Sequence, residues 1–217
     1  MPLAGNGMLI TSMDIEPADE REFNAWYDRE HLAERVAIDG FLEARRWVAD
    51  RASPKYFCTY STATFETLTS SAYRQALATQ TERSKANIAR FRNMGRVIGR
   101  VTVSRGHGRG AVLGVVRLRP APEGAEALRR AVRELLDPGT LEGVVSMHLV
   151  EGDAELSKSL TEPDKPNPGA ADCYVLIDGT DLPAVRALIE DRFRTAAGAV
   201  VSTGTYRLLW DLSRSDL

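Results

Sequence analysis

The order of expected secondary-structure elements repeats once along the chain, and this repeat constrains the fold more than any single motif. From residue 8 to residue 104, strand-like and helix-like runs follow the order strand, helix, strand, strand, helix, strand. The same order returns between residues 111 and 212, with little residue identity between the two halves. The Gly-rich run "SRGHGRG" between them is typical of a linker.

A unit with this order forms a four-stranded antiparallel sheet with both helices on one face, and its other face is apolar and uncovered. Two units in one chain can bury those bare faces against each other. We therefore predict an α+β fold of two ferredoxin-like βαββαβ halves whose antiparallel sheets pack as an α/β barrel within one chain. The expected parts are a first half at 1–105, a linker at 106–110 and a second half at 111–217.

Composition describes an ordinary globular protein of 217 residues, 43% of them hydrophobic and 27% charged. The formal net charge of -2 predicts no general attraction to nucleic acid or to an anionic membrane. No signal-like N-terminal segment and no run of about 20 apolar residues is found, so we expect a cytoplasmic protein without a membrane partner. Cys58 and Cys173 lie in apolar strand-like runs, which favours two reduced core thiols.

One stretch departs from this even charge distribution. From Arg83 to Arg119 the chain has no Asp or Glu. Nucleic-acid binding would explain this asymmetry, but no recognition motif or stacking platform accompanies it. We expect instead a solvated helix face, together with contacts to acidic groups of the second half such as those in "EGDAEL".

The stretch "EFNAWYDREHLAER" places unusual side chains on one predicted helix. Phe23, Tyr27 and His31 are four residues apart and share one stripe, with Trp26 on the adjacent one. An imidazole with a pKa near ~6.5 can exchange a proton at neutral pH, and a tyrosine one turn away can orient it or hold a substrate oxygen. We predict His31 and Tyr27 as catalytic residues, with Phe23 and Trp26 as apolar walls; the alternative is that all four are core residues.

Further binding residues are expected on the following hairpin. Arg45, Trp47 and Tyr60 are predicted to contact substrate, with Arg45 holding a carboxylate or enolate; a solvent-facing ion pair is the alternative for the arginine. Glu30, His31 and Glu34 share a helix face, but further metal ligands are too few. We predict no metal and no tightly bound cofactor.

The run "EFNAWYDREHLAERVAIDGFLEARRWVA", followed by "PKYFCTYSTATFETLTSSAYRQAL", resembles the dimeric α/β-barrel superfamily, and within it EthD-like proteins in a tandem form. The resemblance rests on W-Y-x-x-x-H, then G-F, then R-R-W. It covers roughly residues 8–103 by motif and 111–212 mainly by element order. It implies a pocket between the helices and the sheet of a half, where superfamily members bind or convert small molecules.

The same resemblance sets the range of functions to be weighed. Related folds include polyketide cyclases, lactone isomerases, cofactor-independent monooxygenases and haem-handling enzymes, so His31 as an axial haem ligand is one alternative. The second half's helix at 123–136 has no aromatic residue and no histidine, so a second copy of the site is not expected. We predict cofactor-independent proton transfer of the cyclase, isomerase or lyase type on a hydrophobic carbonyl or aromatic compound.

Two other readings stay open at this point. The chain can be a non-catalytic ligand-binding or accessory protein that uses the same pocket. Alternatively, the pocket can be filled by its own side chains. Association of two chains into a homodimer is compatible with all three readings.

Overall fold

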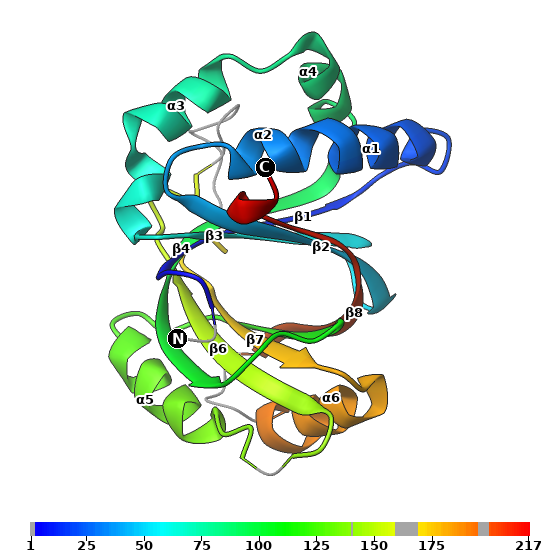
Figure 1. Ribbon diagram of the computed structural model, residues 1–217. Coiled ribbons are helices and arrows are strands. Elements are labelled where there is room, and N and C mark those ends of the chain that lie inside the picture. The colour runs from blue at the N-terminus through cyan, green and yellow to red at the C-terminus, as the bar shows by residue number, and fades with distance from the viewer. Residues whose placement is uncertain (1–2, 140, 159–168, 195–199) are drawn as a thin grey trace.

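Eight antiparallel strands close into one barrel in a computed structural model that describes residues 3–139, 141–158, 169–194 and 200–217 (Figure 1). The strands are β1 Gly7–Asp14, β2 Phe41–Arg51, β3 Tyr56–Thr62, β4 Arg92–Gly106, β5 Val112–Leu118, β6 Val144–Gly152, β7 Cys173–Gly179 and β8 Val200–Ser213. The α-helices are α1 Glu20–Trp26, α2 Leu32–Val36, α3 Ser71–Ala78, α4 Glu82–Ile88, α5 Ala125–Leu135 and α6 Leu182–Leu188. Shorter helical turns are the π-helical η1 Tyr27–His31 and η3 Ile189–Phe193, and the 3₁₀ turns η2 Phe65–Thr69 and η5 Arg214–Asp216.

The barrel is built from two four-stranded sheets that meet at two seams. Around the barrel the strands follow the order β1-β3-β2-β8-β5-β7-β6-β4. One seam joins β2 to β8, for example Ala44 opposite Leu212, and the other joins β4 to β6, for example Val101 opposite Val150. This arrangement confirms the predicted fold class of two ferredoxin-like halves packed as an intrachain barrel.

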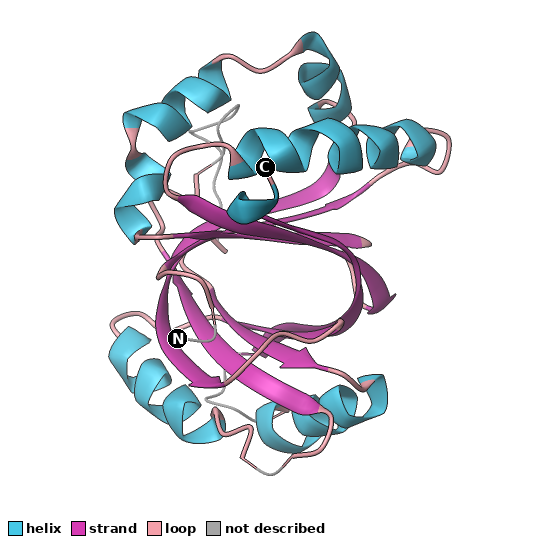
Figure 2. Ribbon diagram, in the orientation of Figure 1, coloured by secondary structure: helices cyan, strands magenta, loops and turns pink. Residues whose placement is uncertain are grey.

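Helices lie on the outside of the barrel, at opposite ends of the view in Figure 2. Helices α1 to α4 cover the sheet of the first half, and α5 and α6 cover that of the second (Figure 1). Several helix starts are held by side-chain caps. Ser70, Thr81 and Asp181 each accept a hydrogen bond from a backbone N–H three residues later.

Alternation along the strands divides the apolar side chains into three cores. In each half, one core fills the space between helices and sheet, and Phe23, Leu32 and Ile98 belong to the first of these. A third core contains strand residues from both halves, among them Met8 and Leu113, and therefore lies inside the barrel. The sheets thus have two buried faces, and a strand residue faces either a helix layer or the barrel interior.

The basic stretch finds most of its acidic partners in its own half. Arg92 pairs with Glu16 and Arg100 with Glu66, whereas Glu151 in "EGDAEL" pairs with Arg129 of α5. The expected contacts with acidic groups of "EGDAEL" are therefore not what balances these arginines. Local carboxylates are closer in space because each helix packs on the sheet of its own half.

Other expectations concern single segments. Cys58 and Cys173 are both buried free thiols, as predicted. The proline-rich part of the predicted surface loop, with Pro163, Pro166 and Pro168, lies outside the described residues. In the described part of the chain, no helix is both long and apolar enough to cross a membrane.

Candidate functional site

The predicted catalytic residues lie on a helix with an unusual turn. Helix α1 passes directly into the π-helical turn Tyr27–His31 and then into α2, so the expected single helix is widened by one π turn at its centre. π turns inside α-helices are rare and occur frequently at functional sites. Both predicted catalytic residues, Tyr27 and His31, belong to this turn.

Aromatic side chains of this helix form one packed cluster beneath it. Phe23, Trp26 and Tyr27 are fully buried, and their ring centroids lie 5.2 to 6.4 Å apart. The His31 ring lies against the same cluster, 4.4 Å from Trp26 and 4.9 Å from Tyr27 between centroids. The hydroxyl groups of Tyr27 and Tyr60 are hydrogen-bonded at 2.9 Å. The structure therefore brings together five of the seven predicted site residues.

His31 is uncharged at neutral pH in this position. Removal from water lowers its pKa to about 4, although Glu34 nearby acts in the opposite direction. The Oε2 atom of Glu34 lies 3.8 Å from Nδ1 of His31, beyond hydrogen-bond distance. Among the described residues, nothing hydrogen-bonds to this buried Nδ1, while 12% of the side chain stays exposed. The imidazole is thus neutral, and its Nδ1 atom can still form a hydrogen bond.

The neighbouring hydroxyl groups are held in their protonated form. Burial raises the pKa of both Tyr27 and Tyr60 well above its ordinary value, because the phenolate would be desolvated. The same cause raises the pKa of the Cys58 thiol to about 11. At neutral pH the site therefore offers hydroxyl donors beside a neutral imidazole, and no thiolate.

A short polar chain connects the cluster to helix α4. The indole N–H of Trp26 donates to the Ser84 hydroxyl at 3.0 Å, and that hydroxyl lies 3.4 Å from Glu34. The Glu34 carboxylate in turn has its pKa lowered chiefly by His31. These contacts fix the orientation of Trp26, whose ring packs against His31.

Arg46, and not Arg45, faces this cluster. Its guanidinium lies 4.7 Å from the centre of the Tyr27 ring and 5.0 Å from that of Phe23, and it pairs with Asp28 and Asn24. Arg46 is 1% exposed. Sequence reasoning missed it, although the alternation of the strand would have indicated it if the strand register had been known.

Arg45 and Trp47 lie on the opposite face of β2, inside the barrel. Arg45 donates to Asp178 at 2.6 Å and to the Gly110 carbonyl at 2.5 Å, and its guanidinium stacks over the Trp47 ring at 4.3 Å. Arg45 and Asp178 are both almost fully buried. These two predicted binding residues therefore share no pocket with His31.

His148 joins the same buried network. Its two ring nitrogens are hydrogen-bonded to the hydroxyls of Ser104 at 2.9 Å and Ser146 at 3.0 Å, and Nε2 lies 3.9 Å from the Asp178 carboxylate. Burial and the charge of Arg45 lower the pKa of His148 to about 4, while burial raises the pKa of Asp178. Sequence reasoning missed Asp178 because it lies in the otherwise apolar run "CYVLIDG".

Metal ligands do not gather anywhere in the described residues, where no group of three or more His, Cys, Asp or Glu side chains could hold an ion. Two hollows are lined mainly by residues of the second half. One is lined by residues of β8, α6, η3 and the end of β2, and the other by the 141–144 segment together with α6 and η3. Neither is lined by a predicted site residue.

Comparison with known proteins identifies the fold. No protein-family model matches the sequence, and no curated protein matches it. Among solved structures, an anthrone oxidase-like protein has a TM-score of 0.64 at 10% identity, covering 98% of this chain and 94% of that one. A candidate monooxygenase of Lactobacillus acidophilus NCFM has a TM-score of 0.60 at 11% identity, with 97% of each chain covered. A mutant chlorite dismutase of Candidatus Nitrospira defluvii, in complex with cyanide, has a TM-score of 0.55 at 12% identity, covering 95% and 92%.

At these identities the comparison establishes architecture and leaves the reaction open. The matches cover almost all of both chains, so they include the two halves and both seams of the barrel. Together with the closed strand order, they show that the chain has the fold of a dimeric α/β barrel, with both halves of the barrel in a single chain.

Proposed function

We propose that the chain binds a hydrophobic carbonyl or aromatic compound at His31, Tyr27 and Tyr60 and catalyses a proton transfer there without a resident cofactor. The observation that carries this proposal is the neutral His31, whose buried Nδ1 has no hydrogen-bond partner among the described residues, beside a pair of protonated tyrosine hydroxyls. The π-helical turn that holds Tyr27 and His31 supports it.

The chemistry follows from the protonation states. His31 accepts a proton from the carbon next to a carbonyl, and the electron pair of the broken C–H bond forms the C=C bond of an enolate. The Tyr27 hydroxyl donates a hydrogen bond to the oxygen that gains negative charge. Return of the proton from His31 to a different carbon completes an isomerisation, with no change in oxidation state.

The low pKa of His31 restricts the substrate class. An imidazole whose pKa is about 4 is a weak base, so it suits a C–H bond that is already acidic, such as one between two carbonyls or next to an aromatic ketone. Phe23 and Trp26, both fully buried, form the apolar backing against which the His31 side of the site is held. The name of the anthrone oxidase-like neighbour refers to an aromatic ketone of this kind, which is consistent with the proposal.

The second candidate is a binding protein without turnover. Phe23, Trp26 and Tyr27 are fully buried in mutual contact, so a ligand reaches the cluster only along the exposed edge of His31. A carrier needs that edge for affinity and not for chemistry.

We further propose that the first half carries the site, that the second half is structural, and that the protein works in the cytoplasm.

Hydrogen–deuterium exchange at carbon tests the proposal directly. Anthrone is incubated with the protein in D₂O, and loss of the ring CH₂ signal is followed by NMR for the wild type, His31→Gln and the control His107→Gln. His107 is an exposed histidine of the 106–110 segment, so its substitution changes the same group outside the site. We expect protein-dependent exchange that is lost in His31→Gln and kept in His107→Gln.

Other outcomes separate the alternatives. If the wild type causes no exchange but anthrone changes its tryptophan fluorescence, and His31→Gln weakens that change, the carrier reading is correct. If neither exchange nor a fluorescence change occurs while His31→Gln lowers the thermal midpoint, the cluster is a filled core. Native mass spectrometry of the wild type reports in the same samples whether two chains associate.

A further inference from the structure

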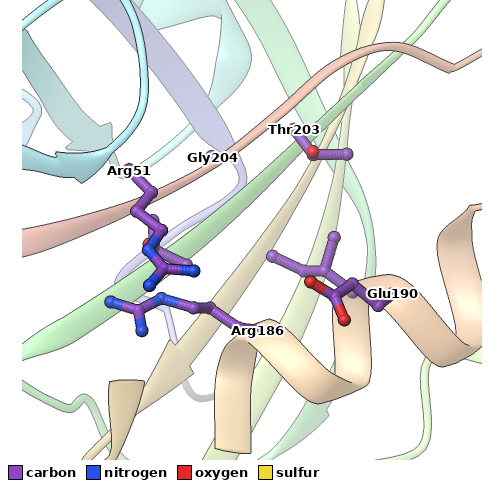
Figure 3. Close-up of a pocket in the computed structure, with 7 residues that line it drawn as sticks. Arg51, Arg186, Glu190, Thr203 and Gly204 are labelled. Carbon is purple, nitrogen blue, oxygen red and sulfur yellow. The ribbon is translucent and has the colours of Figure 1, made fainter. Parts of the chain in front are cut away.

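A hollow of about 110 Å³ lies where the end of β2 in the first half meets β8 and α6 of the second half, and His31 does not line it. It is bordered by the end of β2, helix α6, the π-helical turn η3 and strand β8 (Figure 3). Its lining residues are Arg51, Arg186, Ile189, Glu190, Thr203, Gly204 and Thr205. None of these residues takes part in the chemistry proposed for His31 or in the buried network inside the barrel.

Two arginines converge on this hollow. Figure 3 shows the guanidinium groups of Arg51 and Arg186 pointing toward one another from β2 and α6, and both line the same cavity. Like charges at short range repel, so an arrangement of this kind is stabilised when an anion lies between them. Arginine pairs are well suited to this because each planar guanidinium can donate two parallel hydrogen bonds to an oxyanion.

Both arginines have hydrogen-bonding capacity left. Among the described residues, no group accepts a hydrogen bond from Arg51, which is exposed. Arg186 is paired with Asp50, but its Nε is buried and has no partner in the described chain. The charge of Arg186 is therefore paired with Asp50, while its Nε–H group forms no hydrogen bond among the described residues.

The charged groups around the hollow carry a net positive charge, which favours binding of an anion. Asp50 is held ionised by Arg186 and also accepts from Thr205 at 2.9 Å, while Arg207 lies 3.4 Å from it. Figure 3 shows Glu190 on η3, apart from the two guanidinium groups. Two carboxylates, those of Asp50 and Glu190, thus lie near three arginines, so the net local charge is positive. The Glu190 carboxylate repels an incoming anion.

We propose that this hollow binds a phosphate group, held between Arg51 and Arg186. Its volume of about 110 Å³ admits a group of that size. The hollow includes residues of the π turn at Ile189 and Glu190, a type of turn that occurs frequently at functional sites. The phosphate is either free in solution or the end group of a small phosphate ester.

Titration of the full chain with inorganic phosphate at constant ionic strength tests this site, with binding measured by calorimetry. Arg51→Gln removes one positive group at an exposed position and is expected to weaken binding about three- to fivefold, the scale of an exposed charge interaction. Glu190→Gln removes the opposing charge and is expected to strengthen binding by a similar factor. Arg130→Gln is the control, because Arg130 is an exposed arginine on α5 that pairs only with Glu126.

Opposite shifts for Arg51→Gln and Glu190→Gln, with no shift for the control, support the site. Equal weakening in Arg51→Gln and Arg130→Gln, or no saturable binding by the wild type, overturns it. Phenyl phosphate then distinguishes the sources. Binding tighter than that of inorganic phosphate indicates a phosphate ester, equal binding indicates free phosphate, and both support the proposed site.

Discussion

Substitution of Arg45 by methionine is the most informative test of the network inside the barrel. Arg45 is 5% exposed and Asp178 is 2% exposed, and their charged groups are 2.6 Å apart. Loss of one partner from a buried ion pair costs about 3–5 kcal/mol, because the other charge is left in a medium that solvates it poorly. After Arg45→Met, Asp178 keeps a hydrogen bond from the Gly110 N–H at 3.3 Å and lies 3.9 Å from His148.

The loss of stability caused by Arg45→Met depends on pH in a defined direction. Burial already raises the pKa of Asp178, and removal of Arg45 raises it further, since Arg45 is the largest influence that lowers it. A carboxyl with a raised pKa binds its proton more tightly in the folded state, so stability increases as the pH falls. We therefore expect the loss in Arg45→Met to shrink between pH 7 and pH 5, by up to about 1.4 kcal/mol per pH unit.

Urea unfolding followed by tryptophan fluorescence measures these losses. With a slope of about 3 kcal/mol per M for a domain of this size, the midpoint at pH 7 falls by about 1–1.7 M. The double variant Arg45→Met with Asp178→Leu regains most of the loss, because no buried charge remains. The control Arg207→Met, whose side chain is 63% exposed, changes stability by less than about 1 kcal/mol. A loss below 1 kcal/mol for Arg45→Met, or a double variant less stable than the single one, refutes the reasoning.

Two further predictions concern the histidines and the aromatic cluster. The pKa values of His31 and His148 are lowered from 6.5 to about 4, so the unfolded chain binds more protons between these values and stability falls as the pH drops from 6.5 to 4. Urea midpoints at pH 7 and pH 5 measure this fall; a smaller dependence is expected in His148→Gln, and an unchanged one contradicts the assignment. Phe23→Ala removes a fully buried ring that contacts Trp26 and Tyr27, and is expected to cost about 3–5 kcal/mol in unfolding free energy. A cost below 1 kcal/mol would show that the cluster is not close-packed.

The architecture was predictable because it depends on periodicity. Alternation with a period of two marks the strands, spacing of three and four marks the helices, and the repeated order of the six elements implies two sheets that need each other. The contacts among Phe23, Tyr27 and His31 were predictable as well, because residues four apart on a helix lie on the same face. Local geometry alone decides such neighbours.

The mistaken face of Arg45 has a physical cause in the strand. Phe41 packs toward the helices, and strict alternation would place Arg45 on that same face. The pairing of β2 with β3 shifts in register between Phe41 and Glu43, and this irregularity reverses the faces that follow. Ala44 thereby joins the helix-facing core and Trp47 the barrel interior. A bulge leaves little trace in composition, so the sequence pattern could not reveal it.

The seam between β2 and β8 also determines how this chain can fold. It brings together strands from opposite ends of the sequence, and Arg214 just beyond β8 donates to the Val36 carbonyl, 178 positions away. Contacts of such high contact order form slowly, because the entropy of closing a long loop is lost before any pairing is gained. Each four-stranded sheet can assemble from nearer contacts, including the pairing of β8 with β5, whereas the barrel closes only when β8 also pairs with β2. We therefore expect ring closure, not assembly of either half, to limit the folding rate.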